Sequence, residues 1–241
     1  RAAITIVLSV MAIVSFAPVL YPVFSQISGR RLKKIFDKLV YYTSIIAIPA
    51  TLGLIFITRP LIIAIYGQAY IPAAIPLYAL SFLIFSFGIG DLFTFLLNAK
   101  GKSKYTAKAM IVATSLNIIL SIAFIIFLLP FGEIYAVLGV TFATLISRYY
   151  NFFALAFFSR KLLRIKLDYN HFIKPLIASI IMAFFLFLFN HLLQEKLTVP
   201  ILIIEILLAM LVYFIALFLF RGIHKSDINY LVGISKQLSQ K

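Results

Sequence analysis

The stretch MIVATSLNIILSIAFIIFLL, residues 110–129, contains no charged side chain. An α-helix needs roughly 20 mostly apolar residues to cross the hydrocarbon layer of a bilayer. Strand-like alternation of polar and apolar residues is not seen, so helices are expected to carry the spans. The sequence therefore predicts an all-α, polytopic membrane helix bundle of about seven transmembrane helices. The other windows of suitable length and apolarity are residues 2–24, 40–58, 72–98, 134–158, 172–190 and 200–220.

The composition excludes a soluble domain and most kinds of enzyme. Hydrophobic residues make up 63% of the chain and charged residues 12%, with a mean hydropathy of +1.10, so most of the surface must face lipid. The absence of cysteine excludes disulfides and thiolate sites. His171, His191 and His224 lack metal-ligand spacing, and no Gly-rich phosphate loop or pair of neighbouring carboxylates appears. We therefore expect no catalytic residue, metal or cofactor.

Lysine and arginine follow every second predicted helix, and the connections between these basic segments are nearly bare. By the positive-inside rule, the basic segments and the C-terminus are predicted to be cytoplasmic in a multi-pass cell-membrane protein. The net charge of +15 then reflects topology and attraction to anionic lipid headgroups, and nucleic acid is not expected as a partner. The cations are Arg30, Arg31, Lys33, Lys34 and Lys38; Lys100, Lys102, Lys104 and Lys108; Arg160, Lys161, Arg164 and Lys166; and Arg221, Lys225, Lys236 and Lys241.

The first residue, Arg1, opens inside a hydrophobic run, without an initiator Met or a signal-peptide pattern. An odd number of spans with a cytoplasmic end also places the start outside. We therefore expect a piece of a longer protein, in which about seven more helices precede this chain to give a fourteen-helix transporter. Residues 1–158 are predicted to form five helices of a transport lobe, and residues 159–241 two additional helices and a cytoplasmic tail.

The segment at residues 61–66 is apolar but too short to span a membrane. Arg59 and Pro60 precede it and Gly67 follows it. Because proline and glycine commonly interrupt helices, this segment is predicted to lie at the membrane interface, separate from the span before it.

Arg148 is the first candidate for a functional residue, because inserting a charge at membrane depth costs about 2.5–3.5 kcal/mol. It lies about 3 Å to the cytoplasmic side of the middle of the predicted helix at residues 134–158, where a cation suits a phosphate. An alternative is that this helix leaves the membrane early. Tyr149 and Tyr150 would then form an interfacial aromatic belt, and Arg148 would reach the headgroups.

Asp91 follows Gly88 and Gly90, about 9 Å to the cytoplasmic side of the middle of the predicted helix at residues 72–98. Its side chain and that of Arg148 fall at depths that a pair can bridge. The prediction is therefore a structural ion pair, or one that opens during transport.

Two further polar residues lie within predicted spans. Asn117 is near the middle of its helix, where an amide either hydrogen-bonds across a helix interface or contacts a sugar hydroxyl. Glu205 lies one turn inside the last predicted helix and either reaches outward to water or binds a coupling ion. Asp91 is the other candidate for that ion.

A series of short motifs runs in order along the chain. YPVFSQ at residues 21–26 precedes a basic segment, IAIP at 46–49 precedes Gly53, and YGQAY follows at 66–70. LLPFG at 128–132 comes after Asn117 and before Gly139, Ala143, Thr144 and Ser147. In order and topology this set resembles the polysaccharide-biosynthesis flippases of the multidrug/oligosaccharidyl-lipid/polysaccharide exporter superfamily. The gap from Gly132 to Gly139 is longer than that family usually shows.

The resemblance implies one lobe of a transporter whose two lobes face each other across a central cavity that opens alternately inward and outward. The implied cargo is an oligosaccharide on a polyprenyl phosphate or pyrophosphate carrier. The implied partners are this lipid, the membrane lipids and an N-terminal lobe of the same chain. Arg148, Asn117 and Asp91 are where substrate contacts would be placed.

Two other functions remain open at this point. A cation-coupled multidrug-type antiporter of the same superfamily would use Asp91 or Glu205 for its ion. A membrane assembly subunit would not transport at all and would lack a solvated central cavity.

Overall fold

A computed structural model describes residues 6–7, 21, 24–193 and 199–222, so most of the helix predicted at residues 2–24 lies outside the described residues. The described part contains helices and no strand, and five of its segments are long and apolar enough to cross a membrane. The predicted all-α membrane bundle is therefore confirmed. Its elements are α3 (Gly29–Tyr66), the 3₁₀ helix η1 (Gln68–Ala73), α4 (Ala74–Ala99), α5 (Ser103–Leu128), the 3₁₀ helix η2 (Leu129–Phe131), α6 (Glu133–Leu163), α7 (Asn170–Leu193) and α8 (Val199–Leu219).

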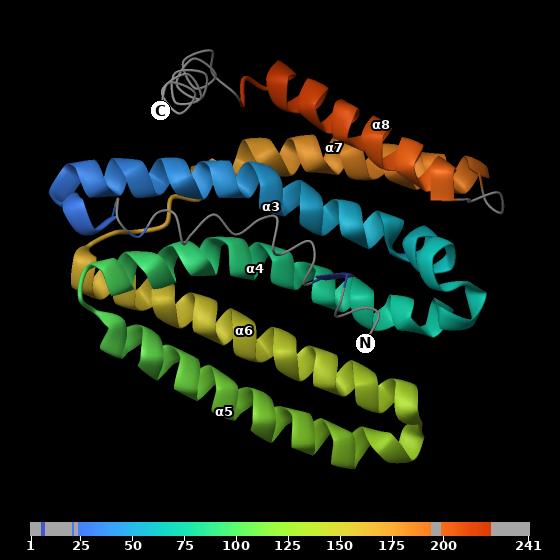
Figure 1. Ribbon diagram of the computed structural model, residues 1–241, viewed down its shortest axis with the longest axis horizontal. Helices are drawn as coiled ribbons and strands as arrows, with labels where there is room; N and C mark the ends of the chain where they lie inside the picture. Colours follow the sequence, from blue (N-terminus) through green and yellow to red (C-terminus); the bar gives the residue numbers. More distant parts are fainter. Residues whose placement is uncertain (1–5, 8–20, 22–23, 194–198, 223–241) are drawn as a thin grey trace, which may run out of the picture.

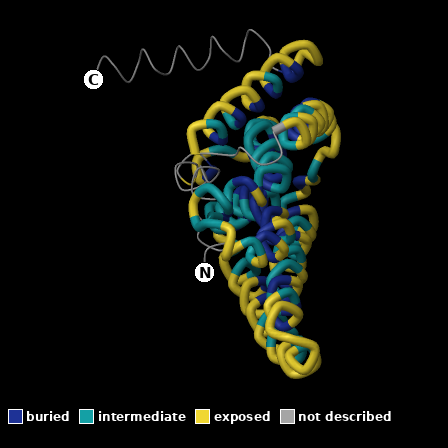
Figure 2. Tube along the Cα trace, turned by 90° about the vertical axis from the view of Figure 1, so that its right-hand side faces the viewer, coloured by how far each residue is buried: buried dark blue, intermediate teal, exposed yellow. Residues whose placement is uncertain are grey.

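The helices lie side by side in the order α8, α7, α3, α4, α6 and α5 (Figure 1). The most buried positions follow the middle of this row, and the helices at its edges are largely exposed (Figure 2). In α5, for example, only Ala109 and Ala113 are buried. Since lipid is as apolar as these side chains, wide exposure of leucine and isoleucine is expected of membrane helices.

Helix α3 corrects one prediction. Residues 61–66 are not separate from the span before them, because α3 continues through Pro49 and Pro60 to Tyr66. A proline inside a helix frees the carbonyl four residues before it and usually costs about 3 kcal/mol or more. Here both freed carbonyls are satisfied by side chains from other helices. The continuity of α3 therefore depends on tertiary contacts that local sequence does not reveal.

The two capping hydrogen bonds come from α8 and α7. The hydroxyl of Tyr213 on α8 donates to the carbonyl of Ile45, four residues before Pro49, at 2.7 Å. The side-chain amide of Asn190 on α7 donates to the carbonyl of Phe56, four residues before Pro60, at 3.3 Å. The carbonyls that the two prolines free thus accept hydrogen bonds that link the α7–α8 pair to α3.

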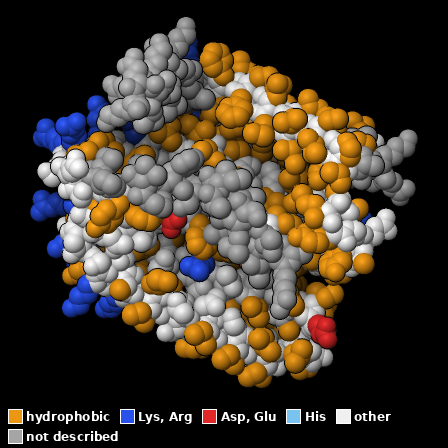
Figure 3. All heavy atoms as spheres, viewed as in Figure 1, with side chains coloured by type: hydrophobic (Ala, Val, Ile, Leu, Met, Phe, Trp, Pro, Cys, Tyr) orange, Lys and Arg blue, Asp and Glu red, His pale blue; other side chains and the backbone are white. Residues whose placement is uncertain are grey.

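The basic segments also differ from the predicted loops. Helix α3 begins at Gly29, so the cations between Arg30 and Lys38 form its first turns, and Arg160 and Lys161 belong to the last turn of α6. Lysine and arginine are good helix formers, so these helices can extend past the apolar spans into water. Basic side chains gather at the end of the molecule where α3 starts and α6 ends (Figure 3).

Candidate substrate cavity

A cavity of about 900 Å³ lies between α4, α5 and α6. Its walls are mainly apolar, and its polar groups are few: Glu133 at the start of α6, Thr141 and Thr144 farther along, and Arg148 in the middle of that helix. Apolar walls with a few convergent polar groups are typical of ligand sites. The apolar lining includes Pro76, Leu80 and Leu83 of α4, Ile125 of α5, and Val137 and Val140 of α6.

Arg148 lies halfway along α6, about 22 Å from either end at 1.5 Å per residue. Its guanidinium carbon is 4.7 Å from the centroid of the Phe87 ring on α4, a cation–π contact that holds the charge beside the cavity. Helix α6 continues for fifteen residues beyond Arg148 before it ends at Leu163. The helix itself therefore does not stop at the tyrosines that follow Arg148.

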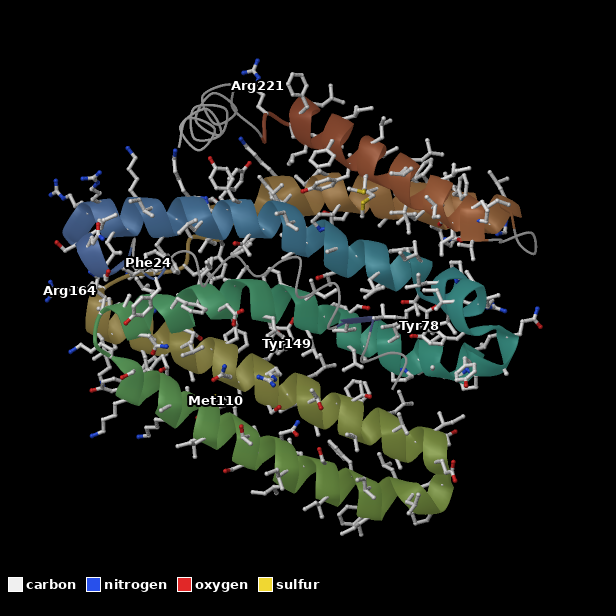
Figure 4. All side chains as sticks on the ribbon, in the orientation of Figure 1. Phe24, Tyr78, Met110, Tyr149, Arg164 and Arg221 are labelled. Atoms are coloured by element: carbon white, nitrogen blue, oxygen red, sulfur yellow. The ribbon has the colours of Figure 1, made fainter. Side chains whose placement is uncertain are left out.

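Tyr149 adds a second link between the same two helices. Its hydroxyl donates a 3.0 Å hydrogen bond to the backbone carbonyl of Phe82 on α4. Figure 4 shows the labelled Tyr149 between α4 and α6. Because Phe87 and Tyr149 flank Arg148 from α4 and α6, the position of the guanidinium is set by the α4–α6 interface.

Asp91 lines a second, small cavity of about 50 Å³ together with Arg148. Asn151 and Phe152 on α6 and Thr94 on α4 also line it, and the side-chain oxygen of Asn151 is buried without a hydrogen-bond partner within the described residues. The structure thus brings together the two charges that the sequence suggested as a pair. An acid beside the arginine lowers the cost of keeping both at membrane depth.

Asn117 links α5 to α6. Its amide donates to the hydroxyl of Thr144 at 3.3 Å and to that of Ser147 at 3.2 Å. Thr144 lines the large cavity, whereas Asn117 does not. This is the interhelical geometry that one of the two sequence-based alternatives describes, and the amide reaches the cavity only through Thr144.

Glu205 lies away from the cavity, on the face of α8 that packs against α7. The expectation that its side chain reaches outward to water is wrong, since the residue is 0% exposed. Glu205 shares a helical stripe with the buried Leu202, Ala209 and Tyr213, which turns it toward the neighbouring helices. It interacts with the side chain of Asn190, but neither carboxylate oxygen has a hydrogen bond of normal geometry within the described residues.

Sequence reasoning did not identify most of the cavity lining. Glu133, Val137, Thr141, Thr144 and Arg148 recur at intervals of three or four residues and so share one face of α6. That periodicity was a signal available in the sequence. The role of Phe87 could not be predicted in this way, because α4 contains several phenylalanines and only the packing of α6 shows which one contacts Arg148.

The chain was compared with known proteins. A family profile described as "Polysaccharide biosynthesis protein" matches residues 2–75. No curated protein sequence matches the chain. Among solved structures, "Lipid II flippase MurJ, inward closed conformation" matches with a TM-score of 0.67 and 24% sequence identity over 96% of this chain. This chain has the fold of that flippase.

The profile and the structural match confirm the resemblance predicted from the sequence motifs. The chain covers 46% of the flippase chain, so it spans about half the length of the transporter that it matches. The shared fold makes the chain a multi-pass helical membrane protein and accounts for its row of long apolar helices.

Proposed function

We propose that this chain forms one half of a membrane flippase that carries a lipid-linked oligosaccharide across the cell membrane by alternating access. The observation that carries the proposal is Arg148, a cation halfway along α6 that lines a cavity of about 900 Å³. The flippase fold supports it. The whole transporter would include a second lobe, which matches the chain's 46% coverage of the similar flippase.

The chemistry of the cargo explains why a cation and a cavity are both needed. Phosphate and sugar hydroxyls lose their hydration in hydrocarbon, which makes unassisted crossing extremely slow. Arg148 would pair with the phosphate or pyrophosphate, and Thr141 and Thr144 offer hydroxyls to the sugar. Asp91 would neutralise Arg148 when the cavity is empty, and Asn117 would hold Thr144 in place.

A transporter of this kind needs no catalytic residues. The described residues contain no group of three or more potential metal ligands, and the few polar groups in the cavity suit binding and release. We therefore assign binding and release of a transported substrate to this cavity. In the proposed orientation, the basic ends of α3, α5 and α6 and the C-terminus face the cytoplasm.

The experiment measures the outer-leaflet pool of lipid-linked oligosaccharide in cells that make the protein in its natural form. Membrane-impermeant periodate oxidises only the sugars exposed outside, and a hydrazide dye then reports them. Arg148→Gln is expected to lower this signal at least about tenfold, as removing a charge-assisted contact costs 2 kcal/mol or more. Arg160→Gln, which removes the same charge at the exposed end of α6, should leave it unchanged. Equal signals for Arg148→Gln and the unmodified protein would reject the proposal.

A cation-coupled antiporter is the second candidate, and the buried carboxylate of Glu205 favours it. Neither oxygen of this carboxylate has a hydrogen bond of normal geometry within the described residues, and burying such a charge in a helix interface is costly unless it binds a proton or a sodium ion. This function would couple transport to an ion at the α7–α8 interface. It predicts that transport depends on an ion gradient and on Glu205.

A further inference from the structure

A second large cavity lies far from the proposed substrate site, at the basic end of the molecule. It has a volume of about 630 Å³ and is lined by α3, the start of α7 and Gly222 just beyond α8. Five of its lining residues are lysine or arginine and one is aspartate, so its formal charge is +4 before any contribution from histidine. The transport mechanism proposed above involves none of the residues that line this cavity.

The cations on α3 form a continuous stripe. Arg30, Lys34 and Lys38 follow one another at four-residue spacing and Tyr41 comes three residues later; Lys33 lies directly before Lys34, and all five line the cavity. Arg31 lies off this line and does not line it. The other face of these turns is buried at Leu32, Phe36 and Val40, so the cations of α3 face outward. They share one cavity with Lys174 of α7, and this convergence of cations from two helices suits a shared ligand.

The stripe is unfavourable without an anion. Like charges at these spacings repel each other, and the positive end of the α3 dipole lies at the same turns, where no acidic residue balances it. Helix α7 adds the cation Lys174 and its own N-terminus at Asn170. Asp37 is the one acid among the lining residues; it interacts with Lys33 and lies near Asp168, and the lining as a whole keeps a net positive charge.

The walls of the cavity are positioned by contacts between three helices. The hydroxyl of Tyr41 donates to the carbonyl of Gly222, and the amine of Lys174 donates to the carbonyl of Arg221 at 3.0 Å. His171 packs edge-on against Tyr41, with ring centroids 5.9 Å apart, and its Nε2 is buried without a hydrogen-bond partner within the described residues. Figure 4 labels Arg221 beyond the end of α8. These contacts fix the part of the cavity wall where α3, α7 and the residues after α8 meet, whereas the cations of α3 line its exposed side.

The cavity lies where the basic parts of α3 and α7 give way to their apolar parts, and this position indicates which kind of ligand it binds. The apolar part of α3 begins directly after the basic stripe, at Leu39 and Val40, and the apolar part of α7 follows Lys174. Tyr41 and Tyr42 lie at this boundary, as tyrosines do at the level of lipid headgroups. Basic pockets between membrane helices at this level suit phosphate-bearing headgroups.

We infer that the cavity between α3, α7 and Gly222 is a binding site for a phosphate anion, supplied by the headgroup of an anionic phospholipid. Arg30, Lys33 and Lys34 contact the anion from α3, and Lys174 contacts it from α7. Occupation of the site joins the α7–α8 pair to the basic end of α3. The inference goes beyond the proposed transport site and uses none of its residues.

Binding is measured on the purified, delipidated chain by native mass spectrometry. The probes are dihexanoyl phosphatidylglycerol, dihexanoyl phosphatidylcholine and inorganic phosphate. The unmodified chain should retain phosphatidylglycerol in preference to phosphatidylcholine. Combining Arg30→Gln, Lys33→Gln and Lys34→Gln should weaken retention by about fivefold for each cation removed. Lys174→Gln alone should weaken it by about fivefold as well.

The matched control combines Lys102→Gln, Lys104→Gln and Lys108→Gln, which removes the same charge at the same end of the molecule from the start of α5, outside the cavity. The inference requires this control to bind like the unmodified chain. If both triple variants weaken retention equally, or if phosphatidylglycerol shows no preference, surface charge explains the binding and the site is rejected. Displacement of phosphatidylglycerol by millimolar phosphate would support the anion site and assign a soluble phosphate as its source.

Circular dichroism of each variant without added lipid verifies the fold. The three replaced α3 side chains are exposed, and Lys174→Gln tests the other helix independently. A folding failure in one variant therefore leaves the other as the test. Because the assay measures lipid retention and not transport, its failure would leave the proposed function standing.

Discussion

The guanidinium carbon of Arg148 lies 4.7 Å from the centroid of the Phe87 ring, so the charge of α6 is held over an aromatic face of α4. A cation–π contact of this kind is worth about 0.5–2 kcal/mol. Phe87→Leu keeps the apolar wall and removes the ring. We expect it to lower the outer-leaflet signal of the flipping assay by about two- to thirtyfold. Phe142→Leu, at an exposed position on the same bundle, should not change the signal, and equal effects of the two variants would contradict this role.

Tyr213 is expected to stabilise the bundle through its bond to the carbonyl of Ile45, which Pro49 leaves without a helical donor. Tyr213→Phe removes only the hydroxyl and leaves a buried carbonyl unsatisfied, at a cost of about 1–3 kcal/mol. Thermal unfolding followed by circular dichroism should therefore show a lower Tm. Tyr135→Phe removes a hydroxyl from an exposed side chain and serves as the control. An unchanged Tm for Tyr213→Phe would show that the freed carbonyl is satisfied in another way.

Gly139 sets the distance between α5 and α6. A Cβ at this position would meet the Cβ of Phe124 at 2.6 Å and the Cδ1 of Leu128 at 2.8 Å. Gly139→Ala should therefore push the two helices apart and destabilise the bundle by about 1–3 kcal/mol. At Gly53 a Cβ would meet only the flexible end of Met182, at 3.5 Å. Gly53→Ala should leave the Tm unchanged or raise it, and a similar loss in both variants would refute the close-packing argument.

Glu205 separates the two candidate functions. Glu205→Gln preserves the shape and removes the charge from a site where the carboxylate interacts with Asn190 but neither oxygen has a hydrogen bond of normal geometry within the described residues. For a flippase that uses only the charge of its cargo, the variant should transport normally with an equal or higher Tm, because a desolvated carboxylate has been removed. Loss of transport, together with loss of its dependence on a sodium or proton gradient, would favour the antiporter. Asp168→Asn, at an exposed residue outside the transport cavity, controls for the general effect of removing an acid.

The proposed orientation can be tested directly because the chain contains no cysteine. Ser103→Cys places a thiol at the basic end of α5, and Phe131→Cys places one at the other end of the α5–α6 pair. In intact cells a membrane-impermeant maleimide should label the cysteine at 131 and not the one at 103, as the positive-inside rule requires. Permeabilised cells should label both. The reverse pattern would invert the topology and place the basic cavity outside.

The spans could be predicted from sequence because hydropathy is a local property. Each window at residues 72–98, 110–129, 134–158, 172–190 and 200–220 corresponds to a helix whose bounds differ by at most seven residues, and all of these helices except α6 are among the candidate membrane spans. A helix interior must satisfy its own backbone in lipid, so composition and length suffice to place it. The distribution of cations likewise predicted which helix ends lie together, and Figure 3 shows basic side chains gathered at one end.

Tertiary structure decided what depends on residues far apart in the chain. From the sequence, a span was predicted to end before Pro60. The side chain that donates to the carbonyl freed by this proline is Asn190, which lies on α7 and cannot be recognised from the local sequence. Exposure to water was one of two alternatives for Glu205, and only the packing of α8 on α7 shows that it is buried. The cavities of about 900 and 630 Å³ also depend on tertiary structure, because each is lined by residues of separate helices. Local composition determined which segments enter the membrane, whereas helix packing determined which of their side chains meet, because contact energies depend on geometry that no single segment contains.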